Sequence, residues 1–402
     1  MKTIALLFLV LSLGSLEAEA QGARRYETEV FATYQLQSNI PFGQSITAGG
    51  STKTLLLDVY MPAGDTATNR PLVVFIHGGG FKGGDKVSNF GTRVCGGLAR
   101  RGYVVASIEY RVSSSLTTIA QEFEAMVRAV QDAKASVRFF RRYASQYGVD
   151  TTQVFVTGSS AGSITALHMA YLEDVEIPSY VNMASLGSLE GSSGNPGYSS
   201  AVQGVISNWG ALADFRWMKA GDPPVYCVHG VADTVVPYDS SFADGPFKYG
   251  STIVHANAQT LGIPAGLRLF VGTGHTLDNS AVKQDSAIKD FSAWLFTILK
   301  QTPTGLPARG ENPFPENPFL HGNFPNPFNP ATTIEFFLPS AHHVYLGVYD
   351  TFGRLVSLIL DAWTEPGMHR LVFDAARFAS GVYYCRLRTA GRTETGRMLL
   401  VR

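Results

Sequence analysis

The sequence predicts an α/β domain with a mostly parallel sheet flanked by helices, followed by a small all-β sandwich of immunoglobulin-like type. Three observations support this. Between Glu27 and Lys300, apolar runs alternate with segments of helical spacing, which indicates βα units. A proline-rich stretch begins at Gln301. From Ala331 to Arg402 the apolar residues instead recur with a period of two, which is typical of strands.

The first twenty residues predict a signal peptide. Lys2 gives a positive start, 4–13 is an almost unbroken apolar run, and Ala18-Glu-Ala20 is a small-x-small cleavage site. The run is too short for a permanent anchor, and we expect no transmembrane segment elsewhere. A buried N-terminal helix is the alternative. We therefore expect an exported chain.

Six apolar runs of the first domain, residues 21–300, are predicted to be strands of one sheet. The first is uninterrupted and ends in glycines, as expected of a strand buried on both faces. The runs are 71–76, 103–108, 154–156, 204–207, 224–228 and 267–271. Helical spacing over 120–147 places six apolar side chains on one face, and an amphipathic helix over 280–299 closes the domain. The six are Phe123, Met126, Val127, Val130, Val137 and Phe140.

Residues 301–322 are predicted to be an extended linker, because dense proline blocks both helix and central strand. Asn-Pro-Phe occurs at 312–314, 317–319 and again at 326–328. The last domain, residues 323–402, is predicted to hold six short antiparallel strands separated by turn residues. The strands are 333–338, 344–349, 355–360, 369–373, 382–387 and 397–401.

Composition limits the function classes. The 402 residues are 45% hydrophobic, which suffices for a sizeable core, and carry 32 basic against 32 acidic side chains. Because the formal net charge is zero, we expect no nucleic-acid partner. Cys95, Cys227 and Cys385 are too few and too far apart for a disulfide scaffold or a zinc site. We interpret them as buried small hydrophobic residues.

A nucleophile is predicted within Gly158-Ser-Ser-Ala-Gly162, which follows the 154–156 run and precedes a helical stretch over 165–172. This is G-x-S-x-G in its strand–turn–helix context, and its register selects Ser160. A chance match in a glycine-rich chain is the alternative. The flanking glycines suit the sharp turn that the motif requires.

An oxyanion hole is predicted from His77-Gly-Gly-Gly80, after the first strand. Consecutive glycines let backbone N–H groups approach a substrate oxygen, so the amides of Gly79, Gly80 and Ala161 would stabilise a tetrahedral oxyanion. A plain flexible turn is the alternative. A phosphate-binding loop is disfavoured, because Walker spacing is absent. We expect His77 to brace the loop.

Asp233 and His275 are predicted to complete a catalytic triad. Asp233 follows the 224–228 strand, where a carboxylate can orient a histidine; Asp239 and Asp244 are rivals in polar loops. His275 is the histidine on a glycine-flanked loop after a late strand. The order Ser160, Asp233, His275 is that of α/β-hydrolases.

These motifs carry a family resemblance. Residues 50–300 resemble the α/β-hydrolase esterases and lipases with an HGGG loop, particularly carboxylesterases that include feruloyl-esterase-like enzymes. Ser163 departs from many members, which carry glycine there. Residues 323–402, through Asn323-Phe-Pro-Asn-Pro-Phe328, Ser380-Gly-Val-Tyr383 and Arg397-Met-Leu-Leu-Val401, resemble the sorting domain of type IX secretion substrates. That resemblance implies the type IX machinery as partner, and export through the periplasm of a Gram-negative bacterium to the surface or medium.

The sequence thus predicts a secreted serine esterase that works through an acyl-enzyme and needs no metal or organic cofactor. Trp209 and Phe215 are candidates for the substrate pocket, with core packing as the alternative. Family analogy suggests acyl or feruloyl esters of plant polysaccharide as substrates. The remaining alternatives are a serine peptidase on the same fold and a non-catalytic surface-binding protein.

Overall fold

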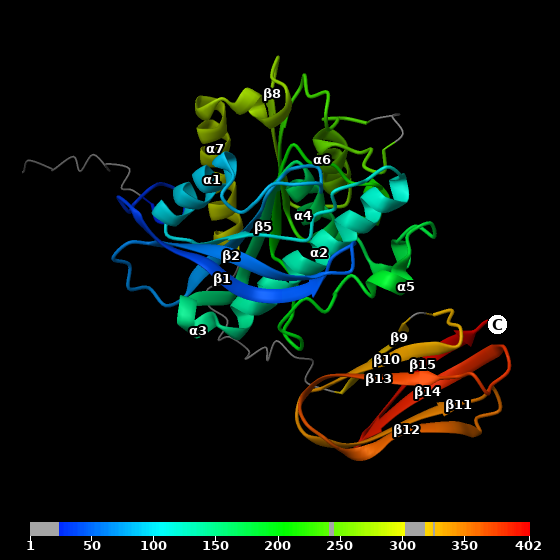
Figure 1. Ribbon diagram of the computed structural model, residues 1–402. Coiled ribbons are helices and arrows are strands. Elements are labelled where there is room, and N and C mark those ends of the chain that lie inside the picture. Colours follow the sequence, from blue (N-terminus) through cyan, green and yellow to red (C-terminus); the bar gives the residue numbers. More distant parts are fainter. Residues whose placement is uncertain (1–23, 241–244, 302–317, 325) are drawn as a thin grey trace, which may run out of the picture.

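The structure is a computed structural model that describes residues 24–240, 245–301, 318–324 and 326–402 (Figure 1). The predicted signal peptide and most of the predicted linker lie outside these residues. Among the described residues, no helix combines the length and apolar character needed to cross a bilayer.

The first domain is built on one eight-stranded sheet with the order β1-β2-β4-β3-β5-β6-β7-β8. The strands β1 and β2 are antiparallel to each other, and β2 is antiparallel to β4, whereas all remaining neighbours are parallel. The prediction of a mostly parallel sheet is confirmed. The strands are β1 (Tyr34–Ile46), β2 (Thr52–Pro62), β3 (Arg70–Ile76), β4 (Val104–Ile108), β5 (Val149–Ser159), β6 (Gly204–Asn208), β7 (Val225–Gly230) and β8 (Ala265–Phe270).

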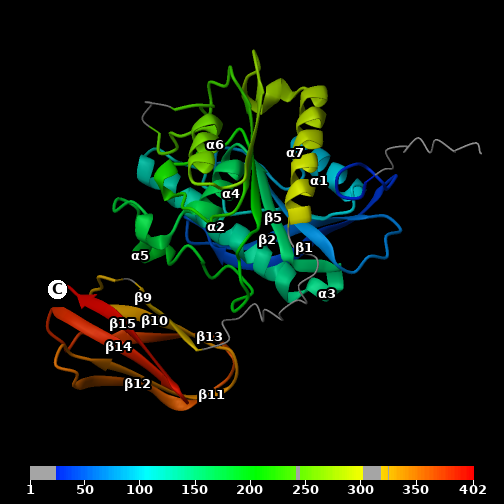
Figure 2. The same cartoon turned by 180° about the vertical axis from the view of Figure 1, so that it is seen from behind.

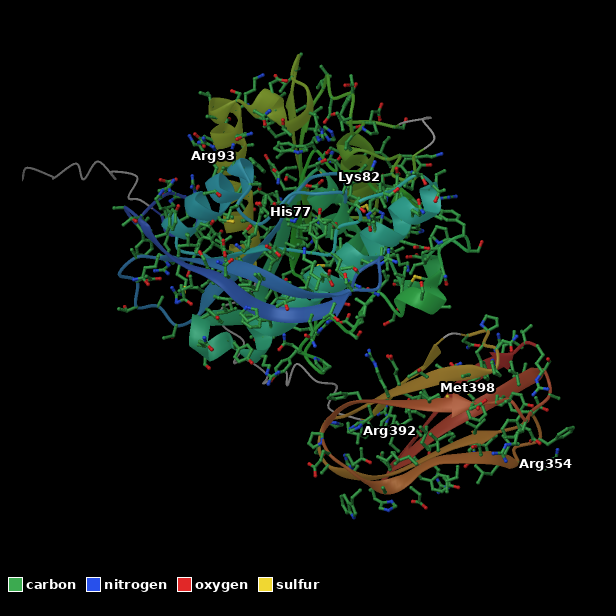
Figure 3. All side chains as sticks on the ribbon, in the orientation of Figure 1. His77, Lys82, Arg93, Arg354, Arg392 and Met398 are labelled. Carbon is green, nitrogen blue, oxygen red and sulfur yellow. The ribbon has the colours of Figure 1, made fainter. Side chains whose placement is uncertain are left out.

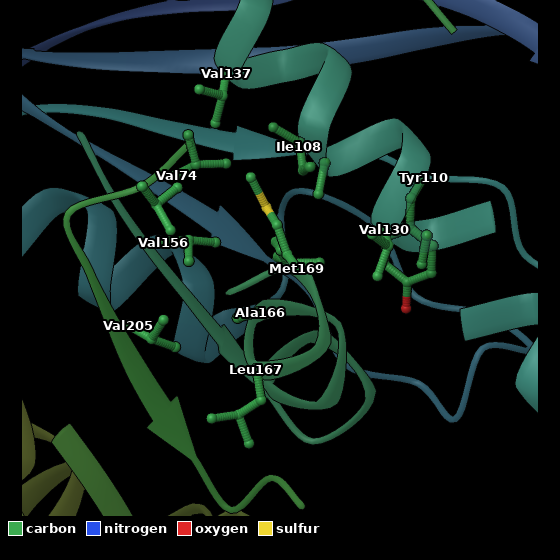
Figure 4. Packing of buried hydrophobic residues seen from close by; sticks show 14 of the residues in the cluster. Val74, Ile108, Tyr110, Val130, Val137, Val156, Ala166, Leu167, Met169 and Val205 are labelled. Carbon is green, nitrogen blue, oxygen red and sulfur yellow. The ribbon is translucent and has the colours of Figure 1, made fainter. Parts of the chain in front are cut away.

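The central strands are buried on both faces, as the uninterrupted apolar runs predict. In β3, Leu72, Val74 and Ile76 belong to one core cluster, while Val73 and Phe75 belong to the other. Successive side chains of a strand point to opposite faces, so a strand between two helical layers needs apolar residues at every position. Figure 4 shows Val74, Val156 and Val205 of three adjacent strands packed in the first cluster.

Helices cover both faces of this sheet (Figures 1 and 2). The predicted apolar face of the 120–147 segment is fully buried, and a break at Tyr143 divides the segment into α2 and α3. One face carries α2 (Ile119–Arg142), α4 (Ala161–Tyr171) and α6 (Ser251–Thr260), and the other α1 (Asn89–Arg100) and α7 (Ala281–Gln301). Short helical segments are α3 (Ala144–Tyr147), α5 (Met183–Leu186), η1 (Asp174–Glu176), η2 (Phe215–Trp217) and η3 (His275–Asn279).

The C-terminal region is a small sandwich of two antiparallel sheets, with strand orders β13-β10-β9 and β12-β11-β14-β15. Its core holds Phe336, Phe373 and Met398, which is labelled in Figure 3. The strands are β9 (Phe319–Phe324), β10 (Ala331–Leu338), β11 (His342–Tyr349), β12 (Leu355–Thr364), β13 (Gly367–Asp374), β14 (Gly381–Thr389) and β15 (Arg392–Leu400).

The sandwich contains one strand more than the sequence predicts. β9 begins at Phe319, inside the predicted linker 301–322, and pairs with β10. Residues 319–324 lack proline, so their backbone N–H groups can join a ladder, and Leu320 is buried in the sandwich core. The high proline content around this segment obscured its capacity to pair. Cys95, Cys227 and Cys385 are buried and free, which confirms their interpretation.

Candidate active site

Ser160 lies in a sharp turn between the end of β5 at Ser159 and the start of α4 at Ala161. Its backbone has φ 53° and ψ −120°, a conformation that non-glycine residues rarely adopt. Such a strained strand-to-helix turn raises the serine hydroxyl above the carboxyl edge of the sheet, where a substrate can reach it. The predicted nucleophile therefore has the local geometry that its motif requires.

Two glycines allow this turn because backbone segments pass within contact of them. A Cβ added to Gly162 would lie 2.0 Å from the carbonyl oxygen of Ile76, at the end of β3. A Cβ on Gly158 would lie 2.3 Å from the carbonyl carbon of Gly162. Contacts this short exclude any side chain, so both positions require glycine.

A buried polar network fixes the turn from below. The Ser163 hydroxyl lies 2.6 Å from the carbonyl oxygen of Gly158 and 2.9 Å from that of Asn208, and it accepts a hydrogen bond from the Asn208 amide at 2.7 Å. The Asn208 carbonyl also accepts from the Ser160 amide at 3.0 Å. Ser163, the residue that departs from the family pattern, thus ties the nucleophile turn to β6.

The glycine loop follows β3 and lies beside the nucleophile turn. Gly79 and Gly80 have φ of 121° and 60°, which glycine adopts at low cost. His77 is buried, its Nδ1 lies 2.7 Å from the Gly78 carbonyl oxygen, and its ring stacks on Tyr110 at 4.3 Å. Burial lowers the pKa of His77, which keeps the ring neutral. The contacts of His77 are those of a bracing residue.

The three amides of the predicted oxyanion hole are available to a ligand. Ala161 is the first residue of α4, so its N–H has no partner within the helix. Among the described residues, no acceptor is recorded for the amides of Gly79, Gly80 or Ala161. A Cβ on Gly78, in the same loop, would lie 3.3 Å from the Ser160 Cβ, so the loop lies directly against the nucleophile.

The structure brings Asp233 and His275 to Ser160. His275 Nε2 lies 3.0 Å from Ser160 Oγ, and His275 Nδ1 lies 2.7 Å from Asp233 Oδ2. Asp233 follows β7, and His275 follows β8, so both side chains stand at the same edge of the sheet as Ser160. The His275 side chain is 19% exposed, whereas that of Asp233 is fully buried.

Asp233 is held ionised by its partners. Burial alone would raise the pKa of this carboxyl, but hydrogen bonds from His229, from His275 and from the amides of Val236 and Val235 outweigh burial and lower it. The amides of Val235 and Val236 donate to Oδ1 at 2.8 and 3.0 Å. An ionised, fixed carboxylate can orient His275 and stabilise its imidazolium.

His275 begins an unusual turn. Thr276, Leu277, Asp278 and Asn279 all have φ between 53° and 57°, in the left-handed region. Leu277 anchors the turn in the core, while Asp278 accepts from the Gly274 amide at 2.8 Å and pairs with Lys283 at 2.8 Å. Lys283, on α7, also donates to Thr273 Oγ1 at 2.9 Å. These contacts hold the loop that presents His275.

The two residues predicted for the substrate pocket, Trp209 and Phe215, pack against other aromatic rings. Trp209 is 1% exposed, belongs to the second core cluster and packs on Phe90 with ring centroids 4.7 Å apart. Its ring lies 6.4 Å from that of His275, so it supports the histidine from within the core. Phe215 packs on Tyr249 at 5.0 Å. The structure therefore favours the packing alternative for Trp209, because a buried ring presents no surface to a substrate.

Other candidates take no part in this cluster. Asp239 accepts a hydrogen bond from Thr252, and Asp244 lies outside the described residues. His168 is buried within α4, and His255 lies in α6. No group of three or more His, Cys, Asp or Glu side chains suited to a metal ion occurs in the described part of the chain.

Sequence reasoning missed two contributors to this site. His229, to which sequence reasoning assigned no catalytic role, lies in β7 and contacts Asp233 Oδ2 at 3.2 Å. Asn208 received no role, although its backbone holds the nucleophile turn. The available signal for His229 was its position four residues before the predicted acid, which places both side chains at the end of one strand.

Two family models match the chain. Residues 57–220 match the BD-FAE family, and residues 323–401 match the secretion system C-terminal sorting domain. The chain carries a BD-FAE α/β-hydrolase domain and a secretion sorting domain. The BD-FAE match includes the glycine loop and the nucleophile turn but ends before Asp233 and His275, whose assignment rests on their geometry.

Individual relatives match part of this chain. Arylacetamide deacetylase-like 2 of Homo sapiens is 28% identical over 40% of this chain and 40% of its own length. Esterase LipI of Mycobacterium tuberculosis is 28% identical over 48% of this chain and 64% of its own. These matches span less than two thirds of either relative. Thermogutta terrifontis esterase 2, solved after phosphorylation by paraoxon, has a TM-score of 0.48 at 21% identity, over 66% of this chain and 94% of that one.

Proposed function

We propose that this protein is a serine esterase that hydrolyses carboxylic esters through a covalent acyl-enzyme, with Ser160, His275 and Asp233 as its triad. The observation that carries the proposal is the continuous chain of contacts from Ser160 Oγ through His275 to Asp233, at 3.0 and 2.7 Å. Three backbone amides without acceptors among the described residues lie beside it. Nucleophile, base, orienting acid and oxyanion donors therefore meet at one point.

The acylation step begins at Ser160. Because Nδ1 of His275 donates to Asp233, its Nε2 is the lone-pair nitrogen and accepts the Ser160 proton. Ser160 Oγ attacks the ester carbonyl, and the resulting oxyanion takes hydrogen bonds from the amides of Gly79, Gly80 and Ala161. The imidazolium then donates its proton to the leaving-group oxygen as the bond between that oxygen and the carbonyl carbon breaks, so the alcohol departs and the acyl group stays on Ser160.

Deacylation repeats the sequence with water. His275 removes a proton from water, the hydroxide equivalent attacks the acyl-enzyme carbonyl, and the same amides hold the second oxyanion. Collapse of this intermediate releases the carboxylic acid and returns the proton to Ser160. No cofactor enters either step. Asp233 remains ionised throughout and keeps His275 in the required tautomer.

We further propose aryl or acetyl esters of plant polysaccharide as the substrates. The ester class is supported by the BD-FAE match and by relatives named as an arylacetamide deacetylase-like protein, a probable isoprenylcysteine alpha-carbonyl methylesterase and an esterase. The polysaccharide is proposed from family analogy alone. The sorting domain, residues 323–402, is proposed to bring the enzyme to the type IX secretion machinery, and so to the surface or medium where such polymers occur.

The test is hydrolysis of p-nitrophenyl acetate, butyrate and octanoate by residues 21–402, beside the variants Ser160→Ala and Ser159→Ala. We expect activity on the short esters, a loss of at least about a thousandfold in Ser160→Ala, and activity within a few-fold of wild type in the neighbouring-serine control. Folded protein without esterase activity, or with activity only on a peptide panel, would contradict the proposal.

The same assay tests the base. A general base that must be neutral predicts that kcat/KM falls on the acidic side of the pH profile. A rate that stays constant between pH 5 and 8 would contradict the role of His275.

A further inference from the structure

We propose that His229 is a positioning residue of the triad: a neutral Nε2–H donor that fixes Asp233 Oδ2 and limits the negative charge this carboxylate presents to His275. The inference rests on the proposed esterase mechanism and extends it by a fourth residue. His229 never touches the substrate in this account. It acts through Asp233, whose Oδ2 atom it shares with His275.

The hydrogen-bond partners of His229 determine its tautomer. Its Nε2 lies 3.1 Å from the Val236 carbonyl oxygen and 3.2 Å from Asp233 Oδ2, and both of these atoms are acceptors. A lone pair cannot face two acceptors, so Nε2 carries a proton. Nδ1 lies 2.8 Å from the Ser251 hydroxyl, which can donate to it. A neutral ring protonated at Nε2 satisfies these contacts, with its one N–H shared between the Val236 carbonyl oxygen and Asp233 Oδ2.

The Asp233 carboxylate is saturated by donors. Oδ1 accepts hydrogen bonds from the amides of Val235 and Val236. Oδ2 accepts one from His275 Nδ1 and lies 3.2 Å from His229 Nε2, whose single N–H it shares with the Val236 carbonyl oxygen. Four donors match the roughly four lone-pair positions of a carboxylate. The carboxylate cannot rotate without breaking several of these bonds. His229 is therefore the fixed donor on the oxygen that His275 uses.

The shared oxygen gives His229 a chemical effect as well. A donor on Oδ2 draws negative charge from the atom that stabilises the His275 imidazolium. Removing that donor leaves Oδ2 more basic, so His275 holds its proton to higher pH. The enzyme would then lose its neutral base at a higher pH than wild type. His229 thus extends the working range of the enzyme toward acid.

Among the described residues around His229, the other titratable and charged groups are paired or neutral. On α6, Ser251 contacts His229, while Asp239 pairs with Thr252. On β7, burial raises the pKa of Cys227 to about 12, so its thiol stays neutral. The remaining neighbours are paired with one another: Asp278 with Lys283 on the His275 side, and Arg268 of β8 with Asp290.

The experiment compares His229→Phe, which removes the donor, with His229→Gln, whose amide can still donate to Oδ2. The matched control is His168→Phe, at a second fully buried histidine that bonds only backbone groups at Ile164 and Ala213. Each protein, residues 21–402, is assayed for kcat/KM on p-nitrophenyl acetate from pH 4.5 to 9, and its thermal unfolding is recorded.

We expect the acidic limb of the His229→Phe profile to move up by about 0.5–1 pH unit, with His229→Gln moving less than half as far. His168→Phe should lower stability without moving the limb. A His229→Phe limb that stays within about 0.2 unit of wild type, or that His168→Phe reproduces, would overturn the proposal.

A second measurement needs no variant and no activity. Nitrogen-15 spectra of histidine-labelled wild type should show His229 as the neutral tautomer protonated at Nε2 in the active enzyme. A ring protonated at Nδ1, or an imidazolium, would overturn the proposal even if the variants fail to fold. Retained esterase activity in Ser160→Ala would instead overturn the proposed mechanism, so the two failures are distinguishable.

Discussion

The nucleophile and the histidine of the proposed triad both lie on turns in which non-glycine residues have positive φ, but the two turns are held differently. The Ser160 turn is clamped by backbone contacts at Gly158 and Gly162 and by the buried Ser163 hydroxyl. The turn after His275 is anchored in the core by Leu277 and is also held by polar contacts, among them a hydrogen bond from Gln284 to the Thr276 carbonyl oxygen. Its outer contact is the Asp278–Lys283 pair, whose side chains are 47% and 34% exposed.

This difference follows from what each residue must do. A nucleophile attacks from one position, so its turn benefits from contacts that leave no freedom. The histidine moves protons between Ser160, the leaving group and water. Its side chain is accordingly 19% exposed. The comparison predicts that changes at the buried turn cost much more than changes at the exposed one.

The largest expected effect is that of Gly162→Ala. Its Cβ would lie 2.0 Å from the Ile76 carbonyl oxygen, so α4 must move away from β3. We expect a loss of more than about 3 kcal/mol in the free energy of unfolding and of at least about a hundredfold in kcat/KM. The control is Gly83→Ala, where an added Cβ meets nothing within 4 Å. Equal tolerance of both substitutions, in denaturation and ester hydrolysis, would refute the clamp.

Ser163→Ala should have a smaller effect. The substitution leaves the buried backbone N–H of Asn208 without its acceptor, which costs about 1–3 kcal/mol in the free energy of unfolding. The nucleophile turn also becomes less constrained, which should lower kcat/KM roughly tenfold. Ser136→Ala is the control, because that buried hydroxyl bonds only to Ala133 in its own helix. If the two variants have the same kcat/KM as wild type, Ser163 does not position Ser160.

The ion pairs of Glu190 are partly exposed, so their loss should cost less stability than changes in the buried turn and more than changes in the exposed one. Glu190, in the segment after α5, binds Lys134 at 3.1 Å and the nearly buried Arg138 at 2.6 Å, both on α2. Burial alone would raise the pKa of Glu190, but these cations and the Ser200 hydroxyl lower it to about 2. The ionised group thus contributes stability above its unfolded-state pKa of about 4.5, and this contribution is lost as pH falls from there toward 2.

Glu190→Gln should therefore lower the free energy of unfolding by about 1–3 kcal/mol at pH 6, with a difference from wild type that shrinks by pH 3. Urea denaturation at both pH values measures it. Asp285→Asn, which breaks the exposed pair with Arg93, is the control and should change stability little at either pH. A Glu190→Gln difference that grows toward acid has the wrong sign for this account.

The smallest effect is expected from Lys283→Met, which removes the outer support of the His275 turn. Since the pair is largely solvated, the unfolding temperature should change by about 2 °C or less, while kcat falls about three- to tenfold. High salt weakens the pair in the wild type. At 1 M NaCl the wild type should therefore approach the variant, and a salt response shared by both proteins would place the effect elsewhere.

The difference between buried and exposed segments also explains which elements the sequence could predict. The runs at 71–76 and 154–156 are apolar at every position, so burial on two faces was evident. Helix α1 was missed because it contains Gly91, Gly96 and Gly97, which lower helix propensity although the helix is stabilised by packing. Strands β1 and β2 were also not predicted, since much of β1 is exposed and polar at the edge of the sheet.

At the site, the sequence indicated residues whose motifs encode local geometry, such as Ser160 between its glycines. It did not indicate the left-handed turn at 276–279, because no glycine marks it. The sequence also did not indicate His229. The role of His229 depends on Asp233, which the loop after β7 folds back against the end of that strand. Contacts made by tertiary folding leave little trace in local patterns.

The central claim is that Ser160 is a nucleophile activated by His275, and covalent labelling tests it without a known substrate. Wild type, Ser160→Ala and His275→Ala proteins would be treated with a fluorophosphonate, and the modified peptide would be mapped by mass spectrometry. We predict one adduct on Ser160 in the wild type, none in Ser160→Ala, and labelling at least about a hundredfold slower in His275→Ala. Labelling that persists in Ser160→Ala, or that does not depend on His275, would contradict the account.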